Sequence, residues 1–201
     1  MKFLIAYNDS LEDQAGSFFA YCGEEVIIET ENRDIESSVL TPPSLTNALL
    51  VQHLSDCQVC VIANHGDAKS IDGDNGDLVS VDTNNKAFLG KLLYAISCTC
   101  AKELKNSLVS DGLRSFWGYD NVLHIWSGYP QFGRSAMAGI KSLLAGNKIK
   151  EAKEHMEAQY NEDIIELETQ YPNRPELAAF LLDNREALVI YGDDELKLSD
   201  L

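Results

Sequence analysis

Short apolar runs and helical stretches alternate along this chain, and the alternation limits it to a small set of folds. We predict strands at residues 2–7, 25–30, 57–64, 92–97, 115–119 and 187–191. We predict helices at residues 11–22, 44–54, 102–109, 133–145, 149–167 and after Pro175. Strands that alternate with helices form a mostly parallel sheet with helices on both faces. The sequence therefore predicts an α/β fold, a three-layer sandwich around a mostly parallel sheet of about six strands. We expect one domain over residues 1–201, with a helical segment at 133–183.

Charge and cysteine content exclude several classes of function. The chain has 201 residues, with 16 Lys and Arg against 32 Asp and Glu, and a formal net charge of −16. Proteins that bind a nucleic-acid backbone need a basic face, so the acidic balance argues against a nucleic-acid partner. No stretch approaches the roughly 18 apolar residues of a membrane span, and residues 1–10 lack the features of a signal peptide. Five cysteines without an export signal are expected to be reduced, so we predict a cytoplasmic protein with no membrane partner.

Two reactive side chains follow predicted strands. His65 comes directly after the run ending in Asn64, and Cys98 comes directly after the run ending in Ser97. If these strands are parallel neighbours, both side chains emerge at the same edge of the sheet, roughly 5 to 10 Å apart. A thiol and an imidazole at that range are the parts of a nucleophile and its general base. Gly66 lets its backbone N–H approach a substrate carbonyl closely. A helix predicted just after Cys98 would stabilise a thiolate.

The same residues give the chain a resemblance to a known family. A strand ending in His65-Gly66, followed by a strand ending in Ser97-Cys98, resembles the caspase-like (clan CD) cysteine peptidases. The short interval between His and Cys is more like gingipain-type and CHAT-type domains than like caspases. Residues 108–119 are similar to the strand that follows a glycine-containing turn in these proteins. Residues 191–198 are similar to their GDP-x-L-x-L ending, with Asp194 where Pro is usual.

The resemblance implies an activity and a set of roles. Members of this family hydrolyse peptide bonds of protein substrates with a His–Cys dyad, and we expect no cofactor or metal in this chain. By resemblance, Cys98 would attack the scissile carbonyl, His65 would protonate the leaving group, and the N–H groups of Gly66 and Cys98 would form the oxyanion hole. CHAT-type peptidases are often switched on by other proteins, so the resemblance also implies an activating protein partner.

Substrate selection in this family depends on a pocket built partly by the loop after the first strand. Here that loop holds Asp9, Glu12 and Asp13, and an acidic pocket would select Arg or Lys before the scissile bond. The alternative is that these residues cap and decorate the first helix. Trp117 lies in the fifth predicted strand and Trp126 follows it, and each is expected either in the core or lining the substrate cleft.

Other interpretations of the same residues stay open. Cys100 is a second candidate for the nucleophile, because it lies two positions beyond Cys98. Cys57 and Cys60 could join them in a zinc site, but three positions apart in a strand the two thiols would point to opposite faces. The acidic run at 72–77 lacks the Glu that closes a calcium loop, so we expect a flexible loop there. Finally, a fold of this kind could serve as a catalytically silent interaction module.

Overall fold

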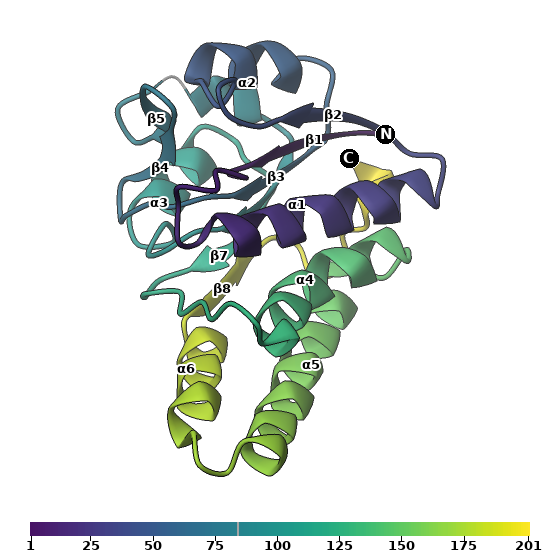
Figure 1. The fold of residues 1–201 in the computed structure, drawn as a ribbon. Helices are drawn as coiled ribbons and strands as arrows, with labels where there is room; N and C mark the ends of the chain where they lie inside the picture. Colours follow the sequence, from purple (N-terminus) through teal and green to yellow (C-terminus); the bar gives the residue numbers. More distant parts are fainter. Residues whose placement is uncertain (84) are drawn as a thin grey trace.

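A six-stranded sheet forms the centre of the molecule (Figure 1). The computed structural model describes residues 1–83 and 85–201. Its sheet has the order β2-β1-β3-β6-β7-β8, and every neighbouring pair is parallel except β7 and β8. The strands are β1 (Lys2–Tyr7), β2 (Glu36–Leu40), β3 (Val59–Ala63), β6 (Leu92–Ile96), β7 (Ser115–Tyr119) and β8 (Leu188–Tyr191). The predicted α/β class and the mostly parallel sheet are confirmed.

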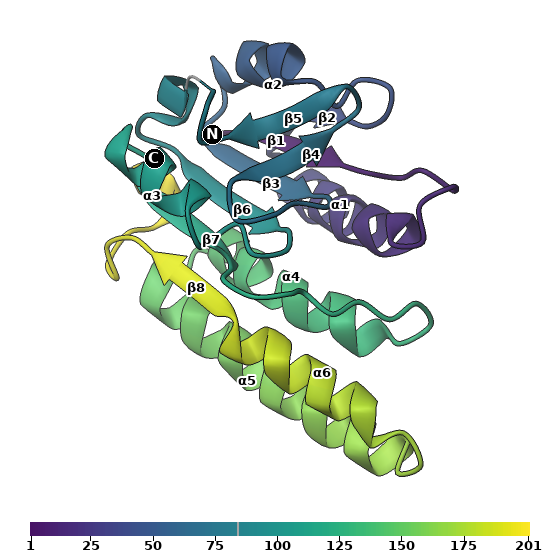
Figure 2. The ribbon, with the colours of Figure 1, turned by 90° about the vertical axis from the view of Figure 1, so that its left-hand side faces the viewer.

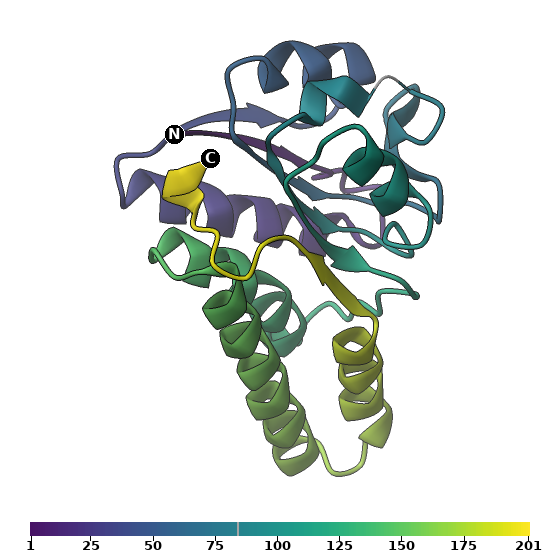
Figure 3. The ribbon, with the colours of Figure 1, turned by 180° about the vertical axis from the view of Figure 1, so that it is seen from behind.

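Helices cover both faces of the sheet and complete a three-layer sandwich (Figure 2). One face is covered by α1 (Gly16–Glu31), α4 (Pro130–Leu144), α5 (Ile149–Gln170) and α6 (Pro175–Glu186). The other is covered by α2 (Asn47–Leu54), α3 (Leu104–Ser110), the 3-10 turn η1 (Asn85–Phe88) and a hairpin of β4 (Ser70–Gly73) and β5 (Gly76–Ser80). A short 3-10 turn, η2 (Leu198–Asp200), ends the chain. The antiparallel pair α5 and α6 projects beyond the sheet (Figure 3). Of the helices that the structure describes, none has the length and apolarity to cross a bilayer.

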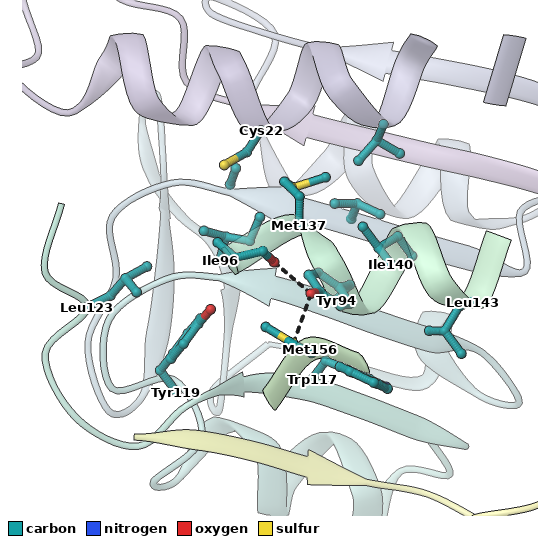
Figure 4. Packing of buried hydrophobic residues seen from close by; sticks show 14 of the residues in the cluster. Cys22, Tyr94, Ile96, Trp117, Tyr119, Leu123, Met137, Ile140, Leu143 and Met156 are labelled. Carbon is teal, nitrogen blue, oxygen red and sulfur yellow. Dashed lines mark hydrogen bonds between the residues drawn. The ribbon is translucent and has the colours of Figure 1, made fainter. Parts of the chain in front are cut away.

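Side chains alternate between the two faces along each central strand, as the pleat requires. In β6, Tyr94 and Ile96 pack under α4 and α5, whereas Leu93 and Ala95 pack under α2 and α3. Figure 4 shows the first of these layers around Tyr94, whose hydroxyl donates a hydrogen bond to the Ala136 carbonyl at 2.7 Å. Because both faces are buried, a one-residue shift in register would move every core side chain to the wrong layer.

Trp117 belongs to this core. Its side chain is 1 % exposed and stacks on Tyr94, with ring centroids 5.5 Å apart (Figure 4). The prediction that Trp117 lines a substrate cleft is therefore wrong. The physical reason is register, because Trp117 lies opposite Tyr94 on the neighbouring strand and so faces the same packed layer.

Two predicted elements differ from the structure. Residues 25–30 are not a strand, because α1 continues through them to Glu31, and the second strand is β2. Cys22, Val26 and Thr30 are all buried, and their four-residue spacing is that of a helix face. β2 escaped prediction because it is an edge strand with polar, partly exposed residues and no apolar run.

The predicted flexible loop at 72–77 instead belongs to the β4–β5 hairpin. Its turn is fixed against the start of α2, since the Asp74 carboxylate accepts the Leu45 N–H at 2.7 Å and the Asp74 N–H donates to the Leu45 carbonyl at 2.8 Å. Gly76 holds the positive φ of 126° that this turn requires. Asp74, one of the acidic residues that suggested a calcium site, therefore has a structural partner.

Candidate active site

The carboxyl ends of β1, β3 and β6 bring together three polar side chains. Ala63 and Ile96 lie opposite each other in the β3–β6 ladder, so His65 and Cys98 each follow by two positions on parallel neighbouring strands. The predicted strand arrangement is confirmed. Both side chains line one open cleft of about 590 Å³, together with Asp13 from the loop between β1 and α1. The other residues lining the cleft are Glu12, Gln14, Ala15, Leu123, His124, Ile125 and Ser127.

His65 is paired with Asp13. Its Nε2 lies 2.8 Å and 3.0 Å from the two carboxylate oxygens, and Asp13 accepts the proton on that nitrogen. The imidazole also meets the Phe19 ring edge-on, with centroids 5.1 Å apart. A carboxylate on one nitrogen fixes the tautomer and leaves the other nitrogen as a proton acceptor.

Asp13 is itself held by the chain around it. Its carboxylate accepts hydrogen bonds from the Asn8 amide at 2.7 Å and from the Ala15 N–H at 2.8 Å. Asn8 is anchored in turn, because its N–H donates to the Ala63 carbonyl at the end of β3. Partial burial alone would raise the pKa of Asp13, but the hydrogen bonds from His65 and Ala15 outweigh it and lower that pKa. The carboxylate therefore stays ionised beside the imidazole.

The pairing of Asp13 with His65 is not among the predictions from the sequence, which gave Asp13 either to a substrate pocket or to the start of the first helix. The strand order gives a signal for this pairing. Because β1 lies parallel beside β3, the loop after β1 starts at the same edge of the sheet as His65. Of the other two acidic residues of that prediction, Asp9 is exposed and does not line the cleft. Glu12 does line it.

Cys98 is partly exposed and sits against the backbone of Leu123. The Leu123 N–H points to Sγ at 3.4 Å, and Sγ lies 3.8 Å from the Leu123 carbonyl. The helix that was predicted to begin just after Cys98 starts only at Leu104. The backbone N–H that contacts the sulfur belongs instead to Leu123, in the segment after β7.

The residue after Cys98 has a strained backbone. Thr99 has φ of 50°, in the left-handed region that β-branched residues rarely adopt. The strained turn is held in place because the Thr99 N–H donates to the Asn121 carbonyl at 3.0 Å. Such strain concentrates at functional sites, where the surrounding structure over-determines it.

Cys100 differs from Cys98 in every relevant respect. It is fully buried on the opposite side of the sheet, among the residues under α2 and α3. Burial raises the pKa of its thiol to about 12. A thiol of that kind is not a nucleophile at neutral pH. The geometry favours Cys98.

Two backbone donors that follow β3 and β6 are unused. Among the described residues, neither the Gly66 N–H nor the Cys98 N–H has a hydrogen-bond acceptor. Gly66 packs so closely that a Cβ there would lie 2.4 Å from Ser97 Oγ and 2.6 Å from the Ser70 carbonyl oxygen. Only glycine fits, and the close packing fixes the backbone from which its N–H projects.

The segment that follows β7 presents a strand-like backbone to the cleft. Leu123 turns its N–H and carbonyl to Cys98, whereas the N–H and carbonyl of His124 are both bonded to the Asn184 side chain at 2.7 and 2.8 Å. Partners on alternating sides are typical of an extended strand. Ile125 follows in this alternation, and its N–H and carbonyl have no partner in the part of the chain that the structure describes. The two groups are free to bind an extended peptide.

The remaining predicted residues lie outside the cleft. Trp126 lines an adjacent hollow rather than the cleft itself. Cys57 and Cys60 do not point to opposite faces, because β3 begins at Val59 and both thiols are buried in the same layer. Across residues 1–83 and 85–201, no three His, Cys, Asp or Glu side chains lie close enough to hold a metal ion.

Comparison with known proteins adds no relative. The sequence matches no model of a protein family, and it matches no curated protein.

Proposed function

We propose that this protein is a cysteine endopeptidase in which Cys98 is the nucleophile and His65 the general base and acid. One observation supports the proposal most: His65 and Cys98 follow neighbouring parallel strands at equal register and line the same open cleft. The carboxylate on His65 and the unused N–H groups of Gly66 and Cys98 add the other parts that acyl transfer needs. The resemblance to caspase-like peptidases points to the same chemistry.

The reaction proceeds through a covalent intermediate. His65 takes the thiol proton, and the Cys98 sulfur attacks the carbonyl carbon of the scissile peptide bond. The N–H groups of Gly66 and Cys98 bind the oxygen as it gains charge. His65 then gives its proton to the leaving amine nitrogen as the C–N bond breaks, which leaves a thioester. Water, deprotonated by His65, attacks that thioester and releases the carboxylic acid and the free thiol. Asp13 keeps the imidazole oriented and stabilises its charged form throughout.

An extended substrate would bind beside Ile125. The free N–H and carbonyl of that residue can pair with a peptide backbone as an added strand does. Leu123 lies next to Cys98 on the same segment, so a peptide paired there brings a carbonyl to the sulfur. This mode of binding suits unfolded or loop segments of a protein substrate.

The enzyme proposed here requires a rearrangement of its two catalytic side chains to become active. His65 is bonded to Asp13 and Cys98 to Leu123, and no hydrogen bond joins His65 to Cys98 in the described structure. Catalytic contacts are often loose before substrate binds. We propose that substrate, or an activating protein partner, brings the two groups together. A reducing compartment such as the cytoplasm would keep Cys98 a free thiol.

A basic preference before the scissile bond stays a prediction. Asp13 is occupied by His65, so Glu12 is the remaining acidic side chain of that loop in the cleft. Fluorogenic peptides with Arg, Lys, Asp and Asn at that position would measure the preference. Faster cleavage after Asp than after Arg would contradict it.

Covalent labelling tests the proposed nucleophile. A peptide that carries a thiol-directed electrophile should form one adduct, and mass spectrometry of the digested protein should place it on Cys98. Cys98→Ala should abolish the adduct. The matched variant Cys100→Ala should retain it, because that thiol is buried on the other side of the sheet. An adduct on Cys100, or labelling that survives in Cys98→Ala, would overturn the assignment.

The alternative function is a catalytically silent interaction module. The contacts of Cys98 favour it, because they join the sulfur to Leu123 and not to the imidazole that would take its proton. The two functions differ in one readout. A silent module would bind an extended peptide through Ile125 without forming the covalent adduct.

A further inference from the structure

We propose that a hollow beside the cleft receives an aromatic side chain of the substrate, about four residues before the scissile bond. The inference rests on the proposed peptidase and names the class of its substrate. The hollow has a volume of about 330 Å³ and lies between the first turns of α1 and the segment that leads into α4. Its walls include Phe18, Tyr21, Trp126, Ser127, Tyr129 and Pro130.

The chemistry of these walls selects an apolar ligand. Four of the named residues carry aromatic rings, and no charged side chain lines the hollow in the described chain. A charged substrate residue would lose its water there without finding a partner. An aromatic side chain would bury a large apolar surface against the rings and gain edge or stacking contacts.

The walls are held in place before any ligand binds. The Arg174 guanidinium lies 4.9 Å from the Trp126 ring centroid and donates a hydrogen bond to the Tyr129 hydroxyl at 2.7 Å. Phe180 stacks with Trp126 at a ring-centroid distance of 6.1 Å. A binding surface that is already ordered loses less entropy when it binds. The residues that fix it come from α6 and the turn before it, which gives the projecting α5–α6 pair a role in the site.

The hollow continues directly from the cleft. Ser127 lines both, and its hydroxyl lies 3.4 Å from the hydroxyl of Ser17 on α1. We place a peptide beside Ile125 with its reacting carbonyl beside Leu123, so that the residues before the scissile bond extend toward Trp126. Counting one substrate residue for each residue of the extended segment places the fourth residue before the scissile bond opposite Trp126. That residue is the one whose side chain the hollow would hold.

A variant that fills the hollow tests this placement. Ser17 is exposed at its rim, so Ser17→Phe adds a ring to the space without disturbing the core. Glu24→Phe is the matched control, because it adds the same ring to an exposed position of the same helix outside the hollow. Peptides would carry Phe, Trp, Leu, Gly or Asp at the fourth position before the scissile bond. We expect kcat/KM to favour the aromatic peptides by roughly 10-fold or more over Gly and Asp. Ser17→Phe should reduce that ratio to about 1, and Glu24→Phe should preserve it.

A second readout separates this inference from the proposed reaction. Binding of the same peptides to Cys98→Ala, followed by fluorescence polarisation, measures the hollow without catalysis. Aromatic preference in binding without cleavage by the wild-type protein supports the hollow and overturns the peptidase. Cleavage without aromatic preference, or with a preference that Ser17→Phe leaves unchanged, overturns the hollow and leaves the peptidase standing. If the peptides are neither bound nor cleaved, both proposals fail.

Discussion

Asp163 and Asp13 have opposite kinds of surroundings, and the contrast distinguishes a structural hydrogen-bond network from a candidate active site. Asp163 lies on α5 with no exposed surface, and it is saturated with donors. Its carboxylate binds Arg134, accepts the Ser135 hydroxyl at 2.7 Å and accepts the Gln159 amide at 3.2 Å. Asp13 holds His65, whose side chain is 48 % exposed at an open cleft.

The difference teaches where chemistry can occur in this fold. The groups around Asp163 bond mainly to one another between two packed helices, so they stabilise the fold and leave nothing for a ligand. At the cleft, in contrast, the Cys98 and Ile125 N–H groups lack acceptors among the described residues, as does the N–H of Gly66, which follows His65. Unused donors beside a thiol and an oriented imidazole are what an acyl-transfer site provides before substrate arrives.

The largest expected effect is on catalysis at Asp13. Asp13→Asn removes the charge that orients and stabilises the imidazole, so kcat/KM should fall by roughly 10²- to 10⁴-fold. Steady-state cleavage of a fluorogenic peptide measures the loss. Glu154→Gln makes the same carboxylate-to-amide change on an exposed face of α5 and should leave the rate unaltered. A fall of less than threefold in Asp13→Asn would mean that the carboxylate only stabilises the loop between β1 and α1.

The next effect is on folding at Asp163. Asp163→Ala leaves the Ser135 hydroxyl and Arg134 without their shared acceptor, so the free energy of unfolding should fall by about 2–3 kcal/mol. The partial exposure of Arg134 keeps the loss below that of a fully buried pair. Urea denaturation followed by circular dichroism measures it. The folded fraction should keep its rate of peptide cleavage, and a rate that fell as far as in Asp13→Asn would break the contrast between the two regions.

A smaller effect is expected at the strained turn. Thr99→Gly relieves the left-handed backbone but adds freedom to the unfolded chain, so a net gain of about 1 kcal/mol is expected in the free energy of unfolding. Thr99→Ala keeps the strain and should show little gain. The urea midpoints of the two variants provide the measurement. Equal midpoints would show that the turn stores no strain.

The smallest effect is a pH dependence at Asp13. Its pKa is lower in the folded protein than the ordinary value of about 3.9, so its ionised form stabilises the fold above pH ~4. That contribution should disappear as the pH falls through the folded pKa. The stability difference between the wild-type protein and Asp13→Asn should therefore be largest near neutral pH and shrink in acid. A difference that grew as the pH fell would reverse the sign argued here.

The central strands could be predicted because their sequences are apolar on both faces. Residues 57–64 and 92–97 match β3 and β6 closely, and these are the strands that set the positions of His65 and Cys98. The edge strand β2 could not be found in this way, since an edge strand needs no apolar run. The strand prediction for residues 25–30 is wrong because a short run with an apolar centre at 26–28 fits a strand and a helix face equally well.

Within the candidate site, the positions of His65 and Cys98 could be predicted from the sequence, but the contacts that each side chain makes could not. The parallel-sheet rule placed His65 and Cys98 at one edge. The bond from His65 to Asp13 depends on the path of a loop, and the position of Trp117 depends on which face of β7 meets α4. Both are decided by packing between segments far apart in the sequence.

One measurement tests the central claim most directly. An unfolded protein substrate is incubated with the wild-type chain and, in parallel, with Cys98→Ala, and the products are analysed by mass spectrometry. The account predicts defined fragments with the wild-type chain and intact substrate with the variant. Intact substrate in both samples, or the same fragments in both, would contradict the claim that Cys98 and His65 cut peptide bonds.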